Sequence, residues 1–326
     1  MIDFIKKFTA VCALLCVSGL AAAAGLDPYE VERFIDEMAV RHQYSRPRLE
    51  GLFRQTRLQG SILEAISRPA EKKPWHAYRP IFLTANRIHG GAAFWSRNAG
   101  ALARAQTQYG VPAEIIVAII GVETQYGENA GNYRVIDALS TLAFHYPKRA
   151  DYFRQELENF LLLCQDGSLD PLGLRGSYAG AMGLPQFMPS SYRSYAVDVN
   201  RDGTADIWHD ADDAIGSVAN YLRGHGWELG GPVIVRVRSL GQDPRPWVET
   251  GINPRTDLRQ LEAAGIRPEQ TLAKNSKAGL LAFDTLEGPE YWLGLPNFFV
   301  ITTYNRSPLY AMAVYQLAQA IRERHG

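Results

Sequence analysis

One acidic residue interrupts an otherwise apolar stretch, and its position suits acid–base chemistry. The stretch from Val111 to Gly127 reads VPAEIIVAIIGVETQYG. Pro112 suits the first turn of a helix and Gly127 the residue just past its end, so the spacing predicts a buried helix with Glu123 near its C-terminal end. Burial and the negative pole of that helix both favour a protonated carboxyl group, which a general acid needs. A structural ion pair or a cap on a neighbouring helix is the alternative role for Glu123.

A glycine-rich segment follows at residues 173–189, with the sequence GLRGSYAGAMGLPQFMP. Four glycines and two prolines in this segment predict a tightly shaped loop whose backbone can approach a ligand closely. The segment lacks the Gly-Lys-Ser/Thr of a phosphate loop and the Gly-x-Ser-x-Gly of a nucleophile elbow. It is therefore either a substrate wall or a structural crossover between helices.

The next stretch, DVNRDGTAD, has the spacing of a calcium loop. Asp198, Asn200 and Asp202 supply oxygen donors at loop positions one, three and five, and Gly203 stands at position six. This is the first half of an EF-hand loop, in which Thr204 would contribute a backbone carbonyl. An Asp/Asn-rich turn without an ion is the alternative, and we favour the metal.

The second half of the loop departs from the EF-hand pattern. Position twelve is His209, where a bidentate Glu is expected, and Asp210, Asp212 and Asp213 lie just beyond it as carboxylates that could close the shell. His209 and His225 form no zinc spacing with another ligand, so we expect no transition-metal site.

The elements that must position these residues are mainly helical in the first part of the chain. Arg68 to Trp75 indicates a loop, and the alternation after Val233 predicts a strand. Ser307 and Pro308 begin a helix after a strand-like run that ends at Thr303. Helical periodicity is expected at residues 27–66, where a second short helix follows Pro47, and at 82–88, 92–109, 137–144, 150–164 and 213–223.

Length and composition permit a large folded protein without a bulk charge. The chain has 326 residues, 46% of them hydrophobic, and its 34 basic and 34 acidic residues cancel. A sizeable core is therefore possible, and the balanced charge argues against a bulk electrostatic attachment to nucleic acid or to anionic membrane, with a local basic patch left open.

The N-terminus has the order of an export signal. Lys6 and Lys7 precede an apolar run that ends in small residues, with cleavage expected near Ala24. Lipid attachment at Cys16 is an alternative that the bulky residue before it disfavours. The mature chain then keeps Cys164 alone, which is expected to pack in the core and allows no internal disulfide.

Four motifs in order resemble the bacterial lytic murein transglycosylases of the B type. They are GVETQYG, GSYAGAMGLPQFMPSSY, DVNRDGTADIW with DAIGSVANYLRGHGW, and FFVITTYNRSPLYAMAV, and the likeness reaches WHAYRPIFLTANRI. The resemblance implies a mainly α (α+β) protein with a lysozyme-like helical core, an α-helical flanking part and a small β lobe. The parts expected are a signal peptide at 1–24, an N-terminal helical part at 25–90, the catalytic core at 91–231 with its metal loop at 198–213, the β lobe at 232–292 and a C-terminal motif and helix at 293–326.

The resemblance also implies roles for individual residues. Glu123 corresponds to the family's single catalytic residue, and the family's structural calcium loop corresponds to Asp198, Asn200, Asp202 and Thr204, with Asp213 as the closing carboxylate and Asp212 as the alternative. The family's groove residues correspond to Ser177, Gln186, Tyr221, Tyr304, Asn305 and Tyr310.

The implied reaction is non-hydrolytic cleavage of the β-1,4 bond between N-acetylmuramic acid and N-acetylglucosamine, leaving a 1,6-anhydromuramic end. An ordinary glycosidase needs two carboxylates, whereas Glu128 lies beyond Gly127 and should not share a face with Glu123. One acid suffices when the substrate supplies the nucleophile. A hydrolytic muramidase and a calcium-stabilised, non-catalytic wall-binding protein are the alternatives.

The expected setting follows from the same observations. We expect a periplasmic monomer that acts on peptidoglycan glycan strands and binds no nucleic acid, with other cell-wall enzymes left open as partners.

Overall fold

The computed structural model describes residues 25–67, 73–241, 243–249, 251–253, 256–273 and 276–326. The expected signal peptide, Cys16 and most of the loop expected from Arg68 to Trp75 lie outside these ranges, and Trp75 itself begins a helix. Within the described residues, no helix combines the length and apolar character needed to cross a membrane.

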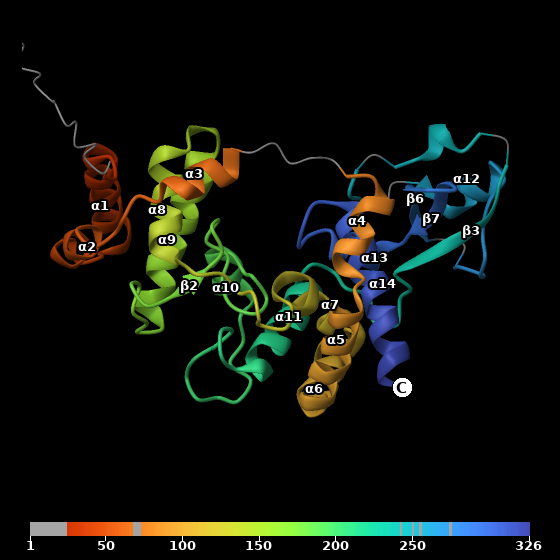
Figure 1. Cartoon of the computed structure of the whole chain (residues 1–326), viewed down its shortest axis with the longest axis horizontal. Coiled ribbons are helices and arrows are strands. Elements are labelled where there is room, and N and C mark those ends of the chain that lie inside the picture. The colour runs from red at the N-terminus through yellow and green to blue at the C-terminus, as the bar shows by residue number, and fades with distance from the viewer. Residues whose placement is uncertain (1–24, 68–72, 242, 250, 254–255, 274–275) are drawn as a thin grey trace, which may run out of the picture.

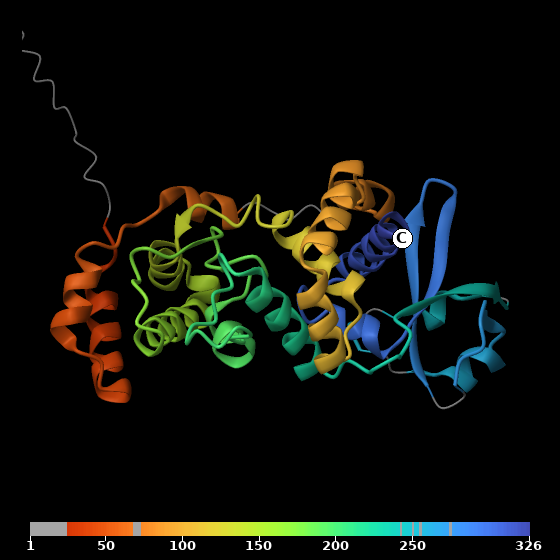
Figure 2. The same ribbon diagram turned by 90° about the horizontal axis from the view of Figure 1, so that it is seen from below.

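One group of helices occupies one end of the elongated molecule (Figures 1 and 2). Its first helix starts where Asp27 accepts hydrogen bonds from the N–H groups of Tyr29 and Glu30. The Phe34 and Phe144 rings pack edge to face at 5.9 Å, so the start of the chain joins the later helices of this group. The group comprises α1 (Pro28–His42), α2 (Arg46–Phe53), α3 (Gly60–Ser67), α8 (Val135–His145), the short η1 (Pro147–Arg149) and α9 (Ala150–Asp166).

A second group packs around the helix that carries Glu123. The helical segments expected at 82–88 and 92–109 are divided differently, because Thr84 caps a new helix and Asn98 ends it. The group comprises α4 (Trp75–Phe82), α5 (Ala85–Arg97), α6 (Ala99–Tyr109), α7 (Ala113–Thr124), α11 (Ala211–Gly224) and α14 (Pro308–His325). The helix α14 begins with Ser307 as N-cap, which confirms that prediction.

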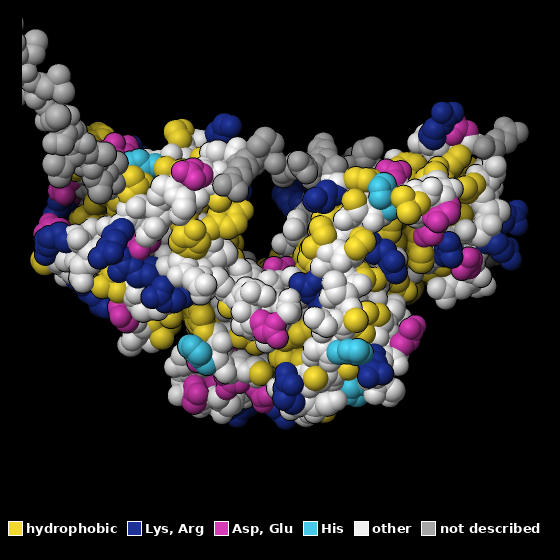
Figure 3. Space-filling view, in the orientation of Figure 1, with side chains coloured by type: hydrophobic (Ala, Val, Ile, Leu, Met, Phe, Trp, Pro, Cys, Tyr) yellow, Lys and Arg dark blue, Asp and Glu magenta, His cyan; other side chains and the backbone are white. Residues whose placement is uncertain are grey.

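Between the two groups lie short elements, of which β2 belongs to the glycine-rich segment. The strands β1 (Tyr133–Arg134) and β2 (Arg175–Gly176) pair antiparallel, and α10 (Pro189–Tyr195) follows. Figure 3 shows the face of the molecule hollowed between the two groups of helices. The glycine-rich segment therefore runs through the region where the hollow forms.

The predicted β lobe is present at the other end of the molecule (Figure 1). Its antiparallel sheet has the strand order β4-β6-β7-β3-β5, and a short helix covers it. The lobe contains β3 (Ile234–Leu240), η2 (Arg245–Trp247), β4 (Thr256–Asp257), α12 (Leu258–Ala263), β5 (Ile266–Pro268), β6 (Lys277–Thr285) and β7 (Gly288–Gly294).

The strand-like run before Thr303 is a helix, so that prediction is wrong. Its residues form α13 (Pro296–Ile301), with Pro296 in the first turn and Phe298 and Phe299 buried. A short apolar run buried on all sides has no periodicity that separates strand from helix.

Strand β6 joins the lobe to the helical body. Leu281 and Phe283 belong to the large core that also contains the helices, whereas Ala278 and Leu280 belong to a smaller core inside the lobe. Phe283 meets Trp75 of α4 edge to face at 5.5 Å. Alternate residues of one strand thus serve two cores.

Cys164 is buried in α9, as expected, and burial raises the pKa of its thiol to about 12.

Candidate active site

Helix α7 brings Glu123 into the hollow from a core of aliphatic side chains. Ten of its 12 residues are buried, and its two glutamates are half-buried. Glu114 forms a surface ion pair with Arg322 at 3.5 Å. Glu123 takes part in no ion pair with the residues that the structure describes. Its carboxyl group therefore has no cation to hold it in the charged form.

The helix ends differently from the sequence expectation. It begins at Ala113, with Pro112 as its N-cap, and ends at Thr124 rather than near Gly127. Gln125 and Tyr126 adopt left-handed φ angles of 52° and 62°. The prediction for Gly127 as the residue just past the end is wrong, because tertiary contacts of Tyr126 hold a conformation that glycine would otherwise favour.

Those contacts come from helix α5. The Tyr126 hydroxyl donates to the Arg87 carbonyl at 2.7 Å, and its ring stacks on Phe94. A Cβ atom on Gly121 would lie 2.5 Å from the Tyr126 hydroxyl oxygen. The Arg87 guanidinium donates to the carbonyl of Gly121 and to that of Ile81, a residue of α4. The C-terminal end of α7 is thus held firmly against α5 and α4.

A tyrosine from the C-terminal helix contacts the carboxyl group of Glu123 directly. The Tyr310 hydroxyl donates to Glu123 Oε1 at 2.5 Å. Burial raises the pKa of Glu123 to about 7, against a smaller lowering by the Tyr310 hydrogen bond. The carboxyl group is therefore half protonated near neutral pH, which suits a group that both gives and takes a proton.

Further tyrosines surround the same carboxyl group. The Tyr304 and Tyr221 rings lie 4.6 Å apart, and Phe187 of the glycine-rich segment packs against both. Burial and then the charge of Glu123 raise the pKa of Tyr304 and of Tyr78 in α4. The groove around Glu123 is therefore walled by phenol rings from widely separated parts of the chain.

Two of these hydroxyl groups differ in their partners. The Tyr221 hydroxyl donates to the Thr303 carbonyl at 2.9 Å. The Tyr304 hydroxyl is buried without a hydrogen-bond partner in the described part of the chain. A buried hydroxyl left unpaired is costly, so it is available to a ligand oxygen.

The glycine-rich segment is tied to the end of α7. The Thr124 hydroxyl lies 3.0 Å from the Leu184 carbonyl, and the Gln186 side chain donates to the Ala130 carbonyl at 3.1 Å. The Ser177 hydroxyl accepts from the N–H groups of Ala179 and Ala181 and so shapes the turn. These contacts place Ser177 and Gln186 in the loop beside the helix that bears Glu123.

Asn305 lies apart from this hydrogen-bonded set. Its side chain is exposed, and its carbonyl accepts from the Ser307 N–H at 2.6 Å at the start of α14. It directly follows Tyr304, so the turn that buries the Tyr304 hydroxyl leaves the Asn305 side chain free to meet solvent or substrate.

The predicted metal loop is folded around its own backbone. Asp198 accepts hydrogen bonds from the N–H groups of Arg201, Asp202 and Gly203. Gly203 has a φ of 99°, as position six of such a loop requires. Asn200 donates to Asp202 at 3.1 Å, so the donors at positions one, three and five gather in one loop.

The donor set fits calcium in kind, since it consists of two carboxylates, an amide and the Thr204 carbonyl. Within the described residues, no three His, Cys, Asp or Glu side chains are arranged to hold a metal ion. The loop therefore offers hard oxygen ligands of mixed type rather than a cluster of carboxylates.

The carboxylates after the loop take different partners. Asp213 is fully buried and accepts from the N–H groups of Val199 and Asp206, so it braces both halves of the loop. Asp212 pairs with Arg104 of α6 at the surface. Of the two candidates for the closing position, Asp213 is the one that contacts the loop.

Two residues of the groove were not singled out from the sequence. Tyr78 lies in the WHAYRPIF region, whose likeness to the family was recognised without a residue being assigned. Phe187 stands next to Gln186 inside a quoted motif. An aromatic residue in a motif is more often core than site, so the sequence offered no signal that separates these two.

The chain matches the family model described as Transglycosylase SLT domain over residues 28–319. It is 46% identical over 300 residues to the membrane-bound lytic murein transglycosylase B of Escherichia coli K12, covering 89% of this chain and 82% of that protein. Catenated lytic transglycosylase SltB1 from Pseudomonas aeruginosa superposes with a TM-score of 0.89 at 53% identity, covering 92% of this chain and 99% of that one.

Two further solved structures were determined with bound groups. Escherichia coli Slt35 in complex with calcium has a TM-score of 0.84 at 46% identity, covering 91% of this chain and 93% of that one. Pseudomonas aeruginosa SltB3 in complex with NAG-NAM-pentapeptide has a TM-score of 0.81 at 32% identity, covering 90% and 79%. Since the family model spans most of the chain and the relatives are this similar along most of their length, the protein belongs to the lytic murein transglycosylase B family.

Proposed function

We propose that this lytic murein transglycosylase uses Glu123 as its single catalytic residue, acting first as acid and then as base. The observation that carries this proposal is a carboxyl group with a pKa of about 7 whose hydrogen-bond partner is the phenol of Tyr310. Burial and that hydrogen bond account for the pKa of Glu123, without a contribution from a second carboxylate among the described residues. A two-carboxylate hydrolysis would require such a partner.

The proposed reaction consumes no water, because the nucleophile is a hydroxyl group of the substrate itself. Protonated Glu123 gives its proton to the glycosidic oxygen as the bond from that oxygen to C1 of the muramic residue breaks. The C6 hydroxyl of the same muramic residue then attacks C1, and the Glu123 carboxylate takes the hydroxyl proton. The net result is a 1,6-anhydro ring on one fragment, a new hydroxyl group on the other, and Glu123 protonated again.

The surrounding residues are proposed to bind the sugars. Tyr221, Tyr304 and Tyr310 offer ring faces for pyranose packing, and the unpaired hydroxyl of Tyr304 can meet a substrate oxygen. Ser177, Gln186 and Asn305 are proposed to contact N-acetyl and hydroxyl groups from the loops that flank α7. The substrate is proposed to carry peptides, as does the ligand named for SltB3.

Replacement of the proposed acid tests the mechanism. We expect Glu123→Gln to lower the release of muropeptides from purified peptidoglycan by about 10³-fold, because the amide gives up no proton. Mass spectrometry of the wild-type products should show anhydro ends. The melting temperature near pH 5 should stay close to that of the wild type.

Glu128→Gln is the matched control, since Glu128 is exposed five residues further on. Full activity of Glu123→Gln would move the acid elsewhere. Reducing ends would indicate a hydrolytic muramidase, and no release by the wild type would leave a wall-binding protein.

We also propose that the loop from Asp198 to Thr204 holds a structural calcium ion, with Asp213 bracing the loop. The donor types support this assignment, and Slt35 was solved in complex with calcium. Bound calcium would supply positive charge that ties the loop's oxygens together. The loop precedes α11, which carries Tyr221, so an ordered loop would help to fix that wall of the groove.

The cellular setting remains a proposal of the same kind. The relative in Escherichia coli is named membrane-bound, whereas the sequence of this chain begins with the order of an export signal. We propose a monomer exported to the periplasm, which size determination by light scattering and cell fractionation would test.

A further inference from the structure

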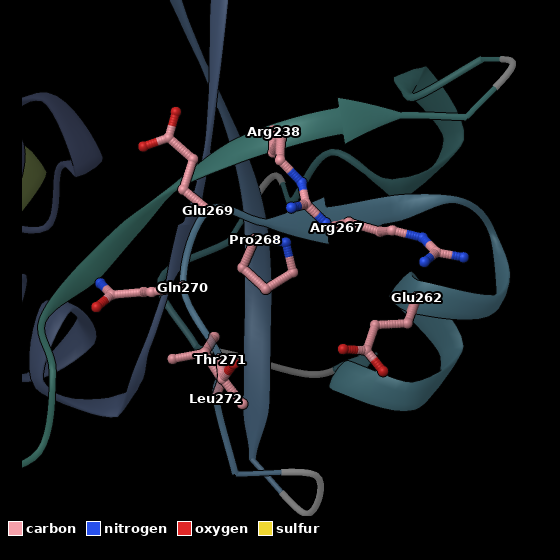
Figure 4. Close-up of a pocket in the computed structure, with 8 residues that line it drawn as sticks. All are labelled: Arg238, Glu262, Arg267, Pro268, Glu269, Gln270, Thr271 and Leu272. Carbon is pink, nitrogen blue, oxygen red and sulfur yellow. The ribbon is translucent and has the colours of Figure 1, made fainter.

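The β lobe contains a pocket that lies outside the groove around Glu123. It has a volume of about 330 Å³ and opens beside β5, the edge strand of the sheet. Figure 4 shows its lining, which comes from β3, α12, β5 and the segment after β5. The lining residues are Arg238, Glu262, Arg267, Pro268, Glu269, Gln270, Thr271 and Leu272.

Two arginines from neighbouring strands line this pocket. Strands β3 and β5 pair Val237 with Pro268 and Ser239 with Arg267, so the register shifts at Arg238. Arg238 lies beside Arg267 across the ladder, where an unshifted register would also pair the two. Both side chains line the pocket, and their guanidinium groups extend in different directions (Figure 4).

These two arginines differ from Arg236, which lies near Arg238 on β3. Arg236 pairs with Glu290 at 3.2 Å and lies over the Trp292 ring. Neither Arg238 nor Arg267 takes part in an ion pair with a described residue, and both are exposed. Exposed guanidinium groups without a carboxylate partner offer planar donors, and a carboxylate matches that geometry.

We propose that this pocket holds the C-terminal carboxylate of a peptide carried by the peptidoglycan strand. The proposal rests on the proposed function, since the substrate must bear such a peptide. Glu262 and Glu269 line the same pocket, so a highly charged anion is disfavoured while a peptide with one local carboxylate is accepted. Gln270 and Thr271 add polar side chains that suit peptide amides. The lobe thereby contributes a contact to the peptide, apart from the sugar-binding groove.

Fluorescence polarisation of the full chain with a labelled peptide tests this site. The probe is the pentapeptide of NAG-NAM-pentapeptide without its sugars, labelled at its amino end, and the comparison probe carries a C-terminal carboxamide. We expect the carboxylate peptide to bind about tenfold more weakly to Arg238→Gln/Arg267→Gln than to the wild type. Arg238→Lys/Arg267→Lys should fall between them, because the charge remains without the planar donors.

The control variant Arg97→Gln/Arg324→Gln removes the same charge from exposed sites outside the lobe and should bind like the wild type. Equal affinity of the wild type for the carboxamide peptide, or unchanged affinity of the Arg238/Arg267 variant, would overturn the proposal. Competition by inorganic phosphate as effective as by unlabelled peptide would also overturn it, in favour of a general anion site.

Measurements on Glu123→Gln distinguish this proposal from the proposed catalytic role. Glu123→Gln should lose cleavage of peptidoglycan while binding the labelled peptide with wild-type affinity. Should Glu123→Gln cleave normally, the catalytic assignment fails and the peptide measurement still decides the pocket. The melting temperatures of all variants confirm that each one folds.

Discussion

Two features of the surroundings of Glu123 shift the pKa of its carboxyl group in opposite directions. The surrounding apolar atoms raise its pKa, and the hydrogen bond from Tyr310 lowers it. Burial is the larger effect, so the group stays protonated up to about pH 7. A single tyrosine hydroxyl therefore controls how far above its ordinary value this pKa can rise.

Removal of that hydroxyl should shift the pH profile. In the wild type, kcat/KM should fall above about pH 7, where Glu123 loses the proton it must donate. Tyr310→Phe removes a hydrogen bond that stabilises the charged carboxylate, so the pKa of Glu123 should rise and the falling limb should move to higher pH. The measurement is the rate of muropeptide release from pH 5 to pH 9.

Tyr109→Phe, at the end of α6, is the matched control and should leave the profile unchanged. If the fall of kcat/KM in Tyr310→Phe occurs at the same pH as in the wild type, or at a lower pH, then Tyr310 does not act on the pKa of the catalytic acid.

The sequence predicted those features of the site that depend on residues near one another in the chain, and not the contacts between residues far apart in it. The burial of Glu123 followed from local periodicity, because its neighbours in the chain are aliphatic. Its contact with Tyr310 joins residues 187 positions apart, and only the family resemblance linked the two motifs. Tyr78 was missed for the same reason, since nothing near it in the chain marks it as facing a carboxyl group.

At the scale of elements, the termini of helices were the least predictable features. The start of α14 at Ser307 and Pro308 follows from local chemistry, and the sequence predicted it. The end of α7 depends instead on Tyr126, whose contacts with α5 stabilise left-handed angles without a glycine. The run that became α13 was ambiguous, because apolar residues on all its sides carry no period.

Calcium should stabilise the fold through the loop after α10. We expect calcium to raise the melting temperature of the wild type by about 5 °C over a sample with chelator, because the ion binds the folded loop. Asp198→Asn should lose most of this rise, since it removes a carboxylate donor from position one.

Asp212→Asn is the matched control and should keep the rise, because Asp212 pairs with Arg104 instead of the loop. A wild-type melting temperature that does not respond to calcium would refute the metal assignment altogether.

Close approach of backbone, rather than turn geometry alone, makes one glycine of the groove region indispensable. Gly131 has a φ of 92°, and a Cβ atom there would lie 2.1 Å from the carbonyl oxygen of Gly176 in β2. We expect Gly131→Ala to lower the free energy of unfolding by at least about 2 kcal/mol, measured by urea denaturation.

Gly226 provides the comparison, since its φ is 93° but its added Cβ would meet open space. Gly226→Ala should lower the free energy of unfolding by about 1 kcal/mol, because only the unfavourable positive φ of the alanine contributes there. Equal losses in the two variants would mean that the contact with Gly176 contributes nothing.

On the scale of the whole molecule, two cores share one strand. Phe283 should anchor the lobe to the body, whereas Leu280 should hold the lobe together internally. We expect Phe283→Ala to reduce hydrogen-exchange protection in both the lobe and α4, with a loss of about 3–5 kcal/mol. We expect Leu280→Ala to reduce protection within the lobe while α4 keeps its wild-type exchange. Identical exchange patterns in the two variants would show that the cores open as one unit.

The two faces of β6 also set a limit on shortening this enzyme. Residues 232–292 look removable in a linear diagram, because they form a sheet with a core of its own. Their excision would take Leu281 and Phe283 from the helical body and leave Trp75 and Phe299 facing water. A shortened enzyme would therefore expose an apolar surface and aggregate unless polar residues replaced the side chains that the lobe now covers.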